Sequence, residues 1–279
     1  MKKLLSILLL VVLGCETMHA QILKDLLKVG EQILKSTPAP SGLSDYHNGI
    51  NAEFKSCTRA SEQVWIDFTL KNNSSSDKQL NVDANITDQN GGKCSPDFIL
   101  GGQMVSTPWP KITIPAGLTV KYRVILRKIK ENCKRLPKVV LKFGDDNFDF
   151  GAVAIAEPNN TNAPNVYCGL PTVQFNLNAV EREGKDIKFK FVMTSRENDV
   201  PINFFARGHT FYDTNGNTYN DISFTLANSD GAATLEEGIP VAGCITVHNV
   251  PESVKSFAML KCSFASGNVY DYFIRIKGQ

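Results

Sequence analysis

The sequence has almost no surplus of charge and no long apolar runs beyond its N-terminus. Its 30 lysine and arginine residues are balanced by 28 aspartate and glutamate residues, which leaves a formal net charge of +2. Because nucleic-acid binding rests on many basic side chains that neutralise phosphates, we expect no nucleic-acid partner. After residue 13 no run approaches the roughly 20 apolar residues that a membrane-spanning helix needs. The mature chain is therefore expected to be soluble or lipid-anchored.

Motifs for catalysis, metals and cofactors are also missing. The sequence has no glycine-rich phosphate loop, no nucleophile elbow and no Cys-x-x-Cys pair. Its four histidines, His19, His47, His209 and His248, stand apart in sequence and form no metal-ligand pair. We therefore expect a protein that is not an enzyme and that holds no metal or cofactor.

One loop resembles the start of a calcium-binding loop. Oxygen-bearing side chains stand at alternate positions of Asp213-Thr214-Asn215-Gly216-Asn217. Thr218 and Phe224 occupy the places where such a loop needs a glycine and a bidentate glutamate. The segment is therefore predicted to be a hairpin turn.

The N-terminus is typical of an export signal, predicted over residues 1–20. Lys2 and Lys3 precede an apolar run over residues 4–13. Two cleavage sites compete: one follows Ala20, and the other lies before Cys15 in a segment that resembles the lipobox of bacterial lipoproteins. The second would make Cys15 the lipidated first residue. Export to the periplasm, to the outer membrane or cell surface, or to the medium is expected.

Residues 21–43 are predicted to form an amphipathic helix and a linker. Apolar residues recur at three- to four-residue spacing up to Lys35, and a segment rich in serine, proline and glycine follows. The apolar face of this helix is expected to pack on the first domain. The alternative is a helix that lies on a membrane surface or associates with a second copy.

Six cysteines follow Cys15, and an exported compartment permits disulfides between them. They are Cys57, Cys94, Cys133, Cys168, Cys244 and Cys262. Three fall in each half of the chain, so full pairing needs one bridge between the halves. The alternatives are structural disulfides or buried thiols, and the sequence does not choose between them.

From residue 44 onward the pattern is that of short strands separated by turns. Runs rich in β-branched and aromatic residues, such as Val64–Leu70 and Leu118–Leu126, end at turn signals such as Asn90-Gly91. A polar segment over residues 157–165 is predicted to be a linker. These patterns predict an all-β fold with a β-sandwich over 44–156 and another over 166–279.

The order of elements in the first half returns in the second with a period of about 120 residues, which suits a duplicated domain. Residues 186–194 match 64–72, residues 209–217 match 85–92, and residues 260–264 match 139–143. Asp213-Thr214-Asn215-Gly216 stands where Asp88-Gln89-Asn90-Gly91 stood.

Turn and strand patterns in both halves resemble the immunoglobulin-like domains of unknown function found in many bacterial exported proteins and lipoproteins. In the first half they are Leu70–Ser74, Asp88–Gly91, Ile114–Gly117 and a closing Lys138–Phe143. In the second half they are Asp213–Gly216, Glu237–Pro240 and Val250–Lys255. The resemblance covers roughly residues 46–276. It implies two immunoglobulin-like sandwiches and an accessory or interaction role, and it carries no catalytic motif.

Two features are candidates for binding. Basic residues crowd the segment Lys121–Lys142, with Glu131 as the only acid, and suit an anionic partner such as a membrane surface or an acidic protein. The candidate residues are Lys121, Arg123, Arg127, Lys128, Lys130, Lys134 and Arg135. Alternation along Leu118–Leu126 predicts that Lys121, Arg123 and Arg127 share one exposed face, opposite the apolar side chains of the strand. The alternative is a solvated edge at which lysines block aggregation. Trp109, between two prolines, could stack on a sugar or fill a partner's pocket.

The sequence therefore predicts a non-enzymatic, exported interaction protein whose sandwich loops and edge strands bind another protein. The alternative is a module that binds carbohydrate or an anionic surface through Trp109 or the basic segment.

Overall fold

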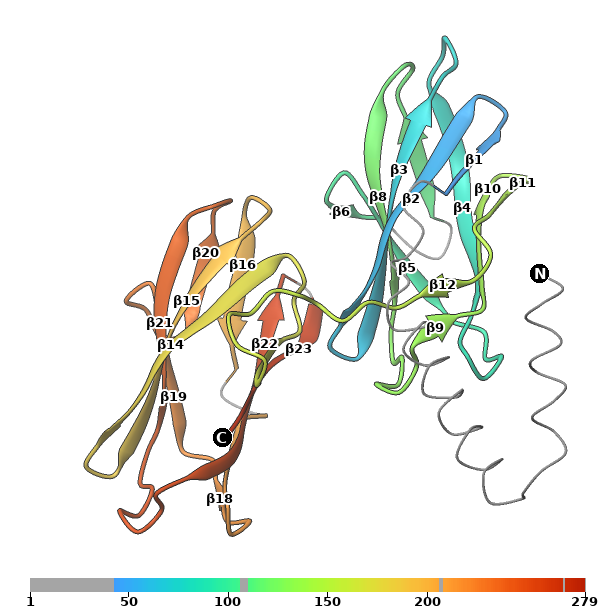
Figure 1. Cartoon of the computed structure of the whole chain (residues 1–279). Helices are drawn as coiled ribbons and strands as arrows, with labels where there is room; N and C mark the ends of the chain where they lie inside the picture. Colours follow the sequence, from blue (N-terminus) through green and yellow to red (C-terminus); the bar gives the residue numbers. More distant parts are fainter. Residues whose placement is uncertain (1–42, 106–109, 206–207, 268, 279) are drawn as a thin grey trace, which may run out of the picture. The chain divides into compact units, whose positions relative to one another are not determined.

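The computed structural model describes residues 43–105, 110–205, 208–267 and 269–278. These residues form antiparallel sheets and contain no helix, which confirms the predicted all-β class (Figure 1). The predicted signal peptide with Cys15, the predicted helix after it and Trp109 lie outside the described residues. No helix in the described ranges could cross a membrane.

The first half of the chain forms a six-stranded sheet in the order β1-β2-β3-β8-β5-β6 and a four-stranded sheet in the order β11-β10-β4-β7, with a short β12-β9 pair. Its strands are β1 (Ser44–His47), β2 (Ile50–Ala60), β3 (Gln63–Asn72), β4 (Lys78–Thr87), β5 (Pro96–Leu100), β6 (Gln103–Met104), β7 (Lys111–Ile114), β8 (Thr119–Leu126), β9 (Arg135–Leu136), β10 (Lys138–Phe143), β11 (Asp146–Asp149) and β12 (Val153–Ala154). The two larger sheets share one core, in which the rings of Tyr122 and Phe143 lie 5.6 Å apart. We call this part the first sandwich.

The second half forms a four-stranded sheet in the order β14-β15-β21-β19 and a seven-stranded sheet built around β13-β23-β22-β16-β20, with β17 and β18 attached to it. Its strands are β13 (Val166–Cys168), β14 (Val173–Glu183), β15 (Asp186–Ser195), β16 (Val200–Phe204), β17 (Thr210–Asp213), β18 (Thr218–Tyr219), β19 (Ile222–Leu226), β20 (Ala232–Leu235), β21 (Pro240–Val247), β22 (Phe257–Ser266) and β23 (Val269–Lys277). Phe189 and Phe211 join the two sheets with ring centroids 6.3 Å apart. We call this part the second sandwich.

The two sandwiches share a strand order. The order β2-β3-β8-β5 in the first corresponds to β14-β15-β21-β19 in the second. The matching turns also share their chemistry: the Asp88 carboxylate accepts from the N–H groups of Asn90 and Gly92 at 2.8 and 2.9 Å. The Asp213 carboxylate likewise accepts from the N–H groups of Asn215 and Asn217. The sequence repeat therefore corresponds to a repeat of turns and strand pairing.

Alternation along β8 agrees with the sequence pattern over most of its length. Tyr122, Val124 and Leu126 are buried, whereas Leu118 precedes the strand and is 55% exposed. Ile125 points to the opposite face and is also buried, in a cluster with apolar residues of the second sandwich. Contact with that sandwich therefore covers part of a sheet face that strand alternation alone assigns to solvent.

Ser61, in the turn after β2, makes the central polar contacts between the two sandwiches. Its N–H donates to the Tyr167 hydroxyl at 3.0 Å, and its Oγ accepts from the Phe273 N–H at 3.1 Å. Close by, the rings of Trp65 and Tyr272 pack edge to face at 6.0 Å. The sequence between the sandwiches is packed rather than free, since Asn160 is buried and its amide donates to the carbonyls of Leu170 and Val173.

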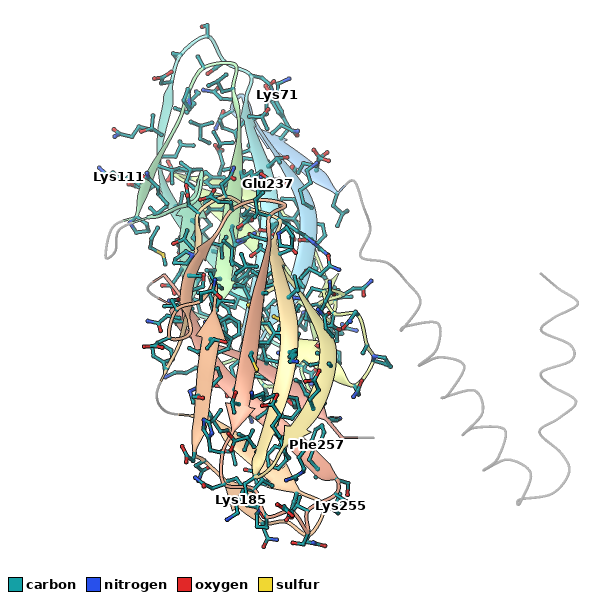
Figure 2. All side chains as sticks on the ribbon, turned by 90° about the vertical axis from the view of Figure 1, so that its left-hand side faces the viewer. Lys71, Lys111, Lys185, Glu237, Lys255 and Phe257 are labelled. Carbon is teal, nitrogen blue, oxygen red and sulfur yellow. The ribbon has the colours of Figure 1, made fainter. Side chains whose placement is uncertain are left out.

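One end of the second sandwich brings three loops together. Lys185 and Lys255 lie at this end (Figure 2). The Val250 N–H donates to the Lys185 carbonyl at 2.8 Å, and the His248 N–H donates to the Asp221 carbonyl at 2.8 Å. The turn after β21 is therefore fixed to the residues that precede β15 and β19.

Glycine at position 169 is required by the contact with Ser61. A Cβ atom at this position would lie 1.8 Å from Ser61 Oγ and 3.2 Å from the Phe273 carbonyl oxygen. We expect Gly169→Ala to lower the free energy of unfolding by about 1–3 kcal/mol, the usual cost of overpacking. Urea unfolding measures the change. Adding Ser61→Gly removes the clash and should recover part of the loss, whereas equal stability of Gly169→Ala and the parent chain would contradict this account.

Candidate functional site

The basic segment does not form one continuous patch, because Arg123 is turned into the contact between the sandwiches. Its Nε donates to Asp67 at 2.6 Å, and its terminal nitrogen donates to Glu197 of the second sandwich at 3.2 Å. The guanidinium also lies 4.2 Å from the centre of the Trp65 ring. Burial opposes the charge, but the two carboxylates outweigh it and raise the pKa of Arg123 above its ordinary value. The prediction that Arg123 lies on an exposed face is therefore wrong.

Two further cations of the segment are paired with carboxylates. Arg127 donates to Asp97 at 2.5 Å, and the Lys134 ammonium lies 2.7 Å from Glu157. Glu131, the one acid within the segment, is paired with Arg275 at 3.7 Å.

Lys128, Lys130 and Arg135 are exposed and have no carboxylate partner among the described residues. Together with Arg127, Lys134 and the residues between them they form the cationic loop, residues 127–135. Lys121 is also exposed, but it lies farther along β8 and belongs to the wall of a cleft.

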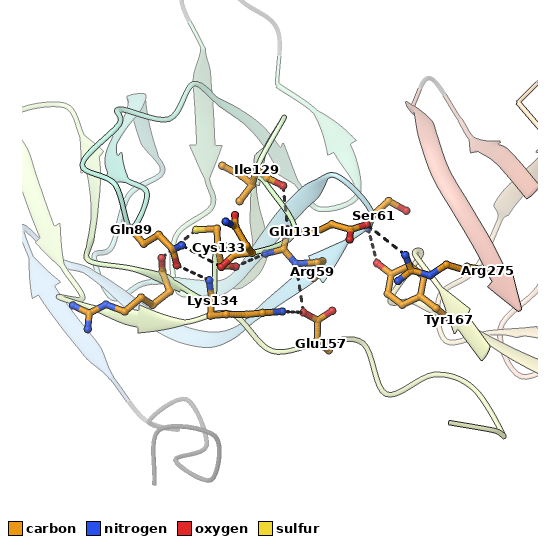
Figure 3. A network of polar contacts seen from close by, with 12 residues as sticks. Arg59, Ser61, Gln89, Ile129, Glu131, Cys133, Lys134, Glu157, Tyr167 and Arg275 are labelled. Atoms are coloured by element: carbon orange, nitrogen blue, oxygen red, sulfur yellow. Dashed lines mark hydrogen bonds and ion pairs between the residues drawn. The ribbon is translucent and has the colours of Figure 1, made fainter. Parts of the chain in front are cut away.

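The backbone of the cationic loop is held by a buried guanidinium. Arg59 is 2% exposed, and its terminal nitrogens donate to the carbonyls of Ile129, at 3.2 Å, and Cys133 (Figure 3). Its Nε lies 3.6 Å from Glu157. Gln89 holds the other side of the loop, because its amide donates to the Asn132 carbonyl at 3.1 Å and its oxygen accepts from the Lys134 N–H at 2.9 Å. The loop therefore presents its cations from a fixed backbone.

A cleft of about 760 Å³ lies beside Arg123, where the two sandwiches meet. Trp65, Lys55, Lys121 and Glu197 contribute to its lining. Most of its charges are already paired, since Lys55 lies 2.5 Å from Glu53 and Arg123 holds both Asp67 and Glu197. The cleft therefore offers less unpaired charge than the cationic loop.

All six cysteines of the described chain are free thiols. Cys57, Cys94, Cys133, Cys168 and Cys262 are buried, and Cys244 is half-buried. Burial raises the pKa of Cys94 to about 11 and that of Cys168 to about 12. A thiol reacts as its thiolate, so burial makes these two cysteines poor nucleophiles.

Hydrogen-bond donors surround the Asp213 carboxylate in its turn. Besides two backbone N–H groups, the carboxylate accepts from the Asn217 amide at 2.7 Å and the Tyr219 hydroxyl at 3.3 Å. The Asn217 side chain and the other donors lower the pKa of Asp213. No group of three or more histidine, cysteine, aspartate or glutamate residues in the described ranges could hold a metal ion.

The three histidines of the described chain have different surroundings, and one of them is missed by sequence reasoning. His47 lies 3.2 Å from Asp45. His209 is buried against Phe224, and its Nδ1 accepts from the Ser263 N–H at 3.2 Å. His248, isolated in sequence, contacts the side chains of Ser223 and Asp186. Strand pairing in the second sandwich brings Ser223, Asp186 and His248 together, although they are far apart in sequence.

The sequence matches no protein-family model and no curated protein. Similar solved structures include a red sea bream transglutaminase, with 14% identity, a TM-score of 0.25 and coverage of 83% of this chain and 31% of that chain. A conserved domain protein from Bacillus anthracis has 10% identity, a TM-score of 0.27 and coverage of 86% and 91%. An anti-sigma factor domain-containing protein from Clostridium clariflavum has 9% identity, a TM-score of 0.24 and coverage of 79% and 88%.

This chain spans about a third of the transglutaminase chain. At these identities and TM-scores the similarities identify neither a family nor an activity.

Arg123 is expected to stabilise the fold rather than to serve as a free anion site. Arg123→Gln leaves Asp67 and Glu197 without their cation, so the free energy of unfolding should fall by about 1–3 kcal/mol. Lys121→Gln, two residues away on the exposed part of β8, should change it by less than about 0.5 kcal/mol. Urea unfolding of both variants tests the difference, and equal effects would show that the Arg123 contacts contribute nothing specific.

His209 should make stability depend on pH. Burial lowers the pKa of His209 from 6.5 to about 4. Between these values the unfolded chain binds a proton that the folded chain does not, so the free energy of unfolding falls as the pH drops from 6.5 to 4. His209→Asn keeps an acceptor for the Ser263 N–H and cannot titrate. The stability difference between parent and variant should change by about 1.4 kcal/mol per pH unit in this window; a constant difference would contradict the lowered pKa.

Proposed function

We propose that the protein is an exported interaction protein that binds an acidic surface of a partner protein through its cationic loop. The observation that supports this proposal is that Lys128, Lys130 and Arg135 stand together without carboxylate partners on a backbone fixed by Arg59 and Gln89. Unpaired cations on a fixed loop attract an anionic surface without the entropy cost of ordering the loop.

The loop charges are not a requirement of the fold. The corresponding turn of the second sandwich is residues 248–255. Lys255 is its only lysine or arginine, and Glu252 is its only acid. A sandwich of the same strand order therefore exists without the cationic loop, which favours a role in binding over a role in folding.

The same proposal includes the finer predictions from the sequence. The two sandwiches would be immunoglobulin-like modules of a bacterial exported protein, with cleavage after Ala20 or lipidation at Cys15. An acidic protein is the partner that we favour, because a protein surface can match a small group of fixed charges with carboxylates at defined positions. Binding to an anionic membrane surface, or to a glycan through Trp109, would not depend on carboxylates that match these fixed charges.

Charge reversal tests the proposal. We expect Lys128→Glu/Lys130→Glu/Arg135→Glu to weaken binding to poly-L-glutamate, a probe for acidic protein surfaces, by at least about tenfold, or about 1.4 kcal/mol. Lys134 is left unchanged because a glutamate there would face Glu157. Isothermal titration calorimetry at two salt concentrations measures affinity, which should fall as salt rises.

The matched control reverses three lysines elsewhere on the first sandwich, with the same change in net charge. Lys71, Lys78 and Lys111 serve this purpose, and Figure 2 marks the first and last of them. The control should bind like the parent chain. Equal losses of affinity in both variants would show that the effect comes from net charge alone. Loop-dependent binding only to vesicles that contain phosphatidylglycerol would identify a membrane surface and overturn the protein-partner proposal.

A further inference from the structure

Three side chains on the second sandwich form a hydrogen-bonded chain. Ser223 Oγ lies 2.7 Å from His248 Nε2, and His248 Nδ1 lies 3.1 Å from Asp186 Oδ2. The His248 and Asp186 side chains are 31% and 36% exposed, so solvent and small molecules reach them. The connectivity is that of an activated serine: the hydroxyl contacts one ring nitrogen, and a carboxylate orients the ring through the other.

Strand pairing places the three groups on one face of the four-stranded sheet. Asp186 opens β15, Ser223 lies in β19, and His248 follows β21, which runs between these two strands. Ser223 and Lys188 are both paired with Thr246 of β21. Because alternate residues share a face, Asp186 and His248 lie on the same face as this row.

Backbone contacts hold the histidine in place. The His248 N–H donates to the Asp221 carbonyl at 2.8 Å, and the Asn249 amide donates to the Asp221 carboxylate at 2.8 Å. The next residue, Val250, is bound to Lys185 beside Asp186. The turn that contains His248 is thus fixed to the neighbours of both its partners, which is the positioning that a general base requires.

We propose that Ser223, His248 and Asp186 form an acyl-transfer site that hydrolyses small esters, an activity separate from the binding role of the cationic loop. Ser223 Oγ attacks the ester carbonyl carbon while its proton passes to His248 Nε2. The carbon–oxygen bond to the leaving group breaks, and the imidazolium returns the proton to the departing alcohol. Water then attacks the acyl carbon and gives a proton to His248; the bond from that carbon to Ser223 Oγ breaks, the imidazolium returns the proton to Oγ, and the carboxylic acid is released. Asp186 accepts a hydrogen bond from Nδ1–H and stabilises the imidazolium.

The surroundings define the class of substrate. Thr246 is directly opposite Ser223, and side chains at such positions have Cβ atoms about 4.5–5.5 Å apart, so the Thr246 hydroxyl, which also lies 3.7 Å from Cys244 Sγ, is a candidate donor to an oxyanion. The site is open to solvent, and an open site accepts acetyl-sized acyl groups that project from a larger molecule. It gives a slow reaction because water is not excluded.

Covalent labelling tests the proposal on the full chain without its predicted signal peptide. A fluorophosphonate probe should form a bond between Ser223 Oγ and phosphorus with loss of fluoride, located by peptide mass spectrometry. Ser223→Ala and His248→Asn should lose labelling and lower 4-nitrophenyl acetate hydrolysis about 100-fold or to the buffer rate. Asp186→Asn should slow labelling and change its pH profile. Circular dichroism confirms that each variant is folded.

Thr225→Ala is the matched control. Thr225 is an exposed hydroxyl on the same face of β19, paired with Cys244 instead of lying beside the histidine. The control and the charge-reversed cationic loop should both label like the parent chain. Labelling at other serines, equal labelling of the urea-unfolded chain, or undiminished hydrolysis by Ser223→Ala would overturn the proposal. These readouts do not depend on partner binding, so the two proposals fail independently.

Discussion

The burial of the Arg59 guanidinium at the end of β2 is the constraint on which much of the structure depends. A buried charge is costly unless carbonyls and carboxylates surround it, and here they come from Ile129, Cys133 and Glu157. The Arg59 N–H also donates to the Ala156 carbonyl at 2.8 Å. Two residues later, Ser61 binds the second sandwich through Tyr167 and Phe273. One strand end therefore fixes the cationic loop, the start of the segment between the sandwiches and their contact.

This arrangement explains why the basic segment divides. The outer face of β8 meets the second sandwich at Arg123 and Ile125, so the charge there is neutralised by Asp67 and Glu197 and the apolar residue joins a core. Beyond Leu126, Glu131 still pairs with Arg275 of the second sandwich, whereas Lys128, Lys130 and Arg135 reach solvent. The distribution of charge follows from which part of the strand is covered, and the binding proposal rests on the part that is not.

Local patterns predicted much of the fold. Runs of β-branched and aromatic residues identified strands such as β3 and β8. The aspartates of two turns are used alike because an Asx turn depends only on neighbouring residues. Coverage of a sheet face depends on the other sandwich, so no local pattern showed that Arg123 is paired. The meeting of Ser223 with His248 depends on register across β19, β21 and β15, and residues distant in sequence give no signal of it.

The shared strand order allows the two sandwiches to be compared position by position. Arg127 follows β8 directly, as His248 follows β21. Asp97 stands one residue after the partner of the last β8 residue, and Ser223 stands one residue after the partner of the last β21 residue. The same place therefore holds an Arg127–Asp97 ion pair in one sandwich and a His248–Ser223 pair in the other. An ion pair suffices to join the two strands there, so the added contact from Asp186 is not required by the fold. This additional Asp186–His248 contact is the reason to propose a catalytic site in the second sandwich and a binding site in the first.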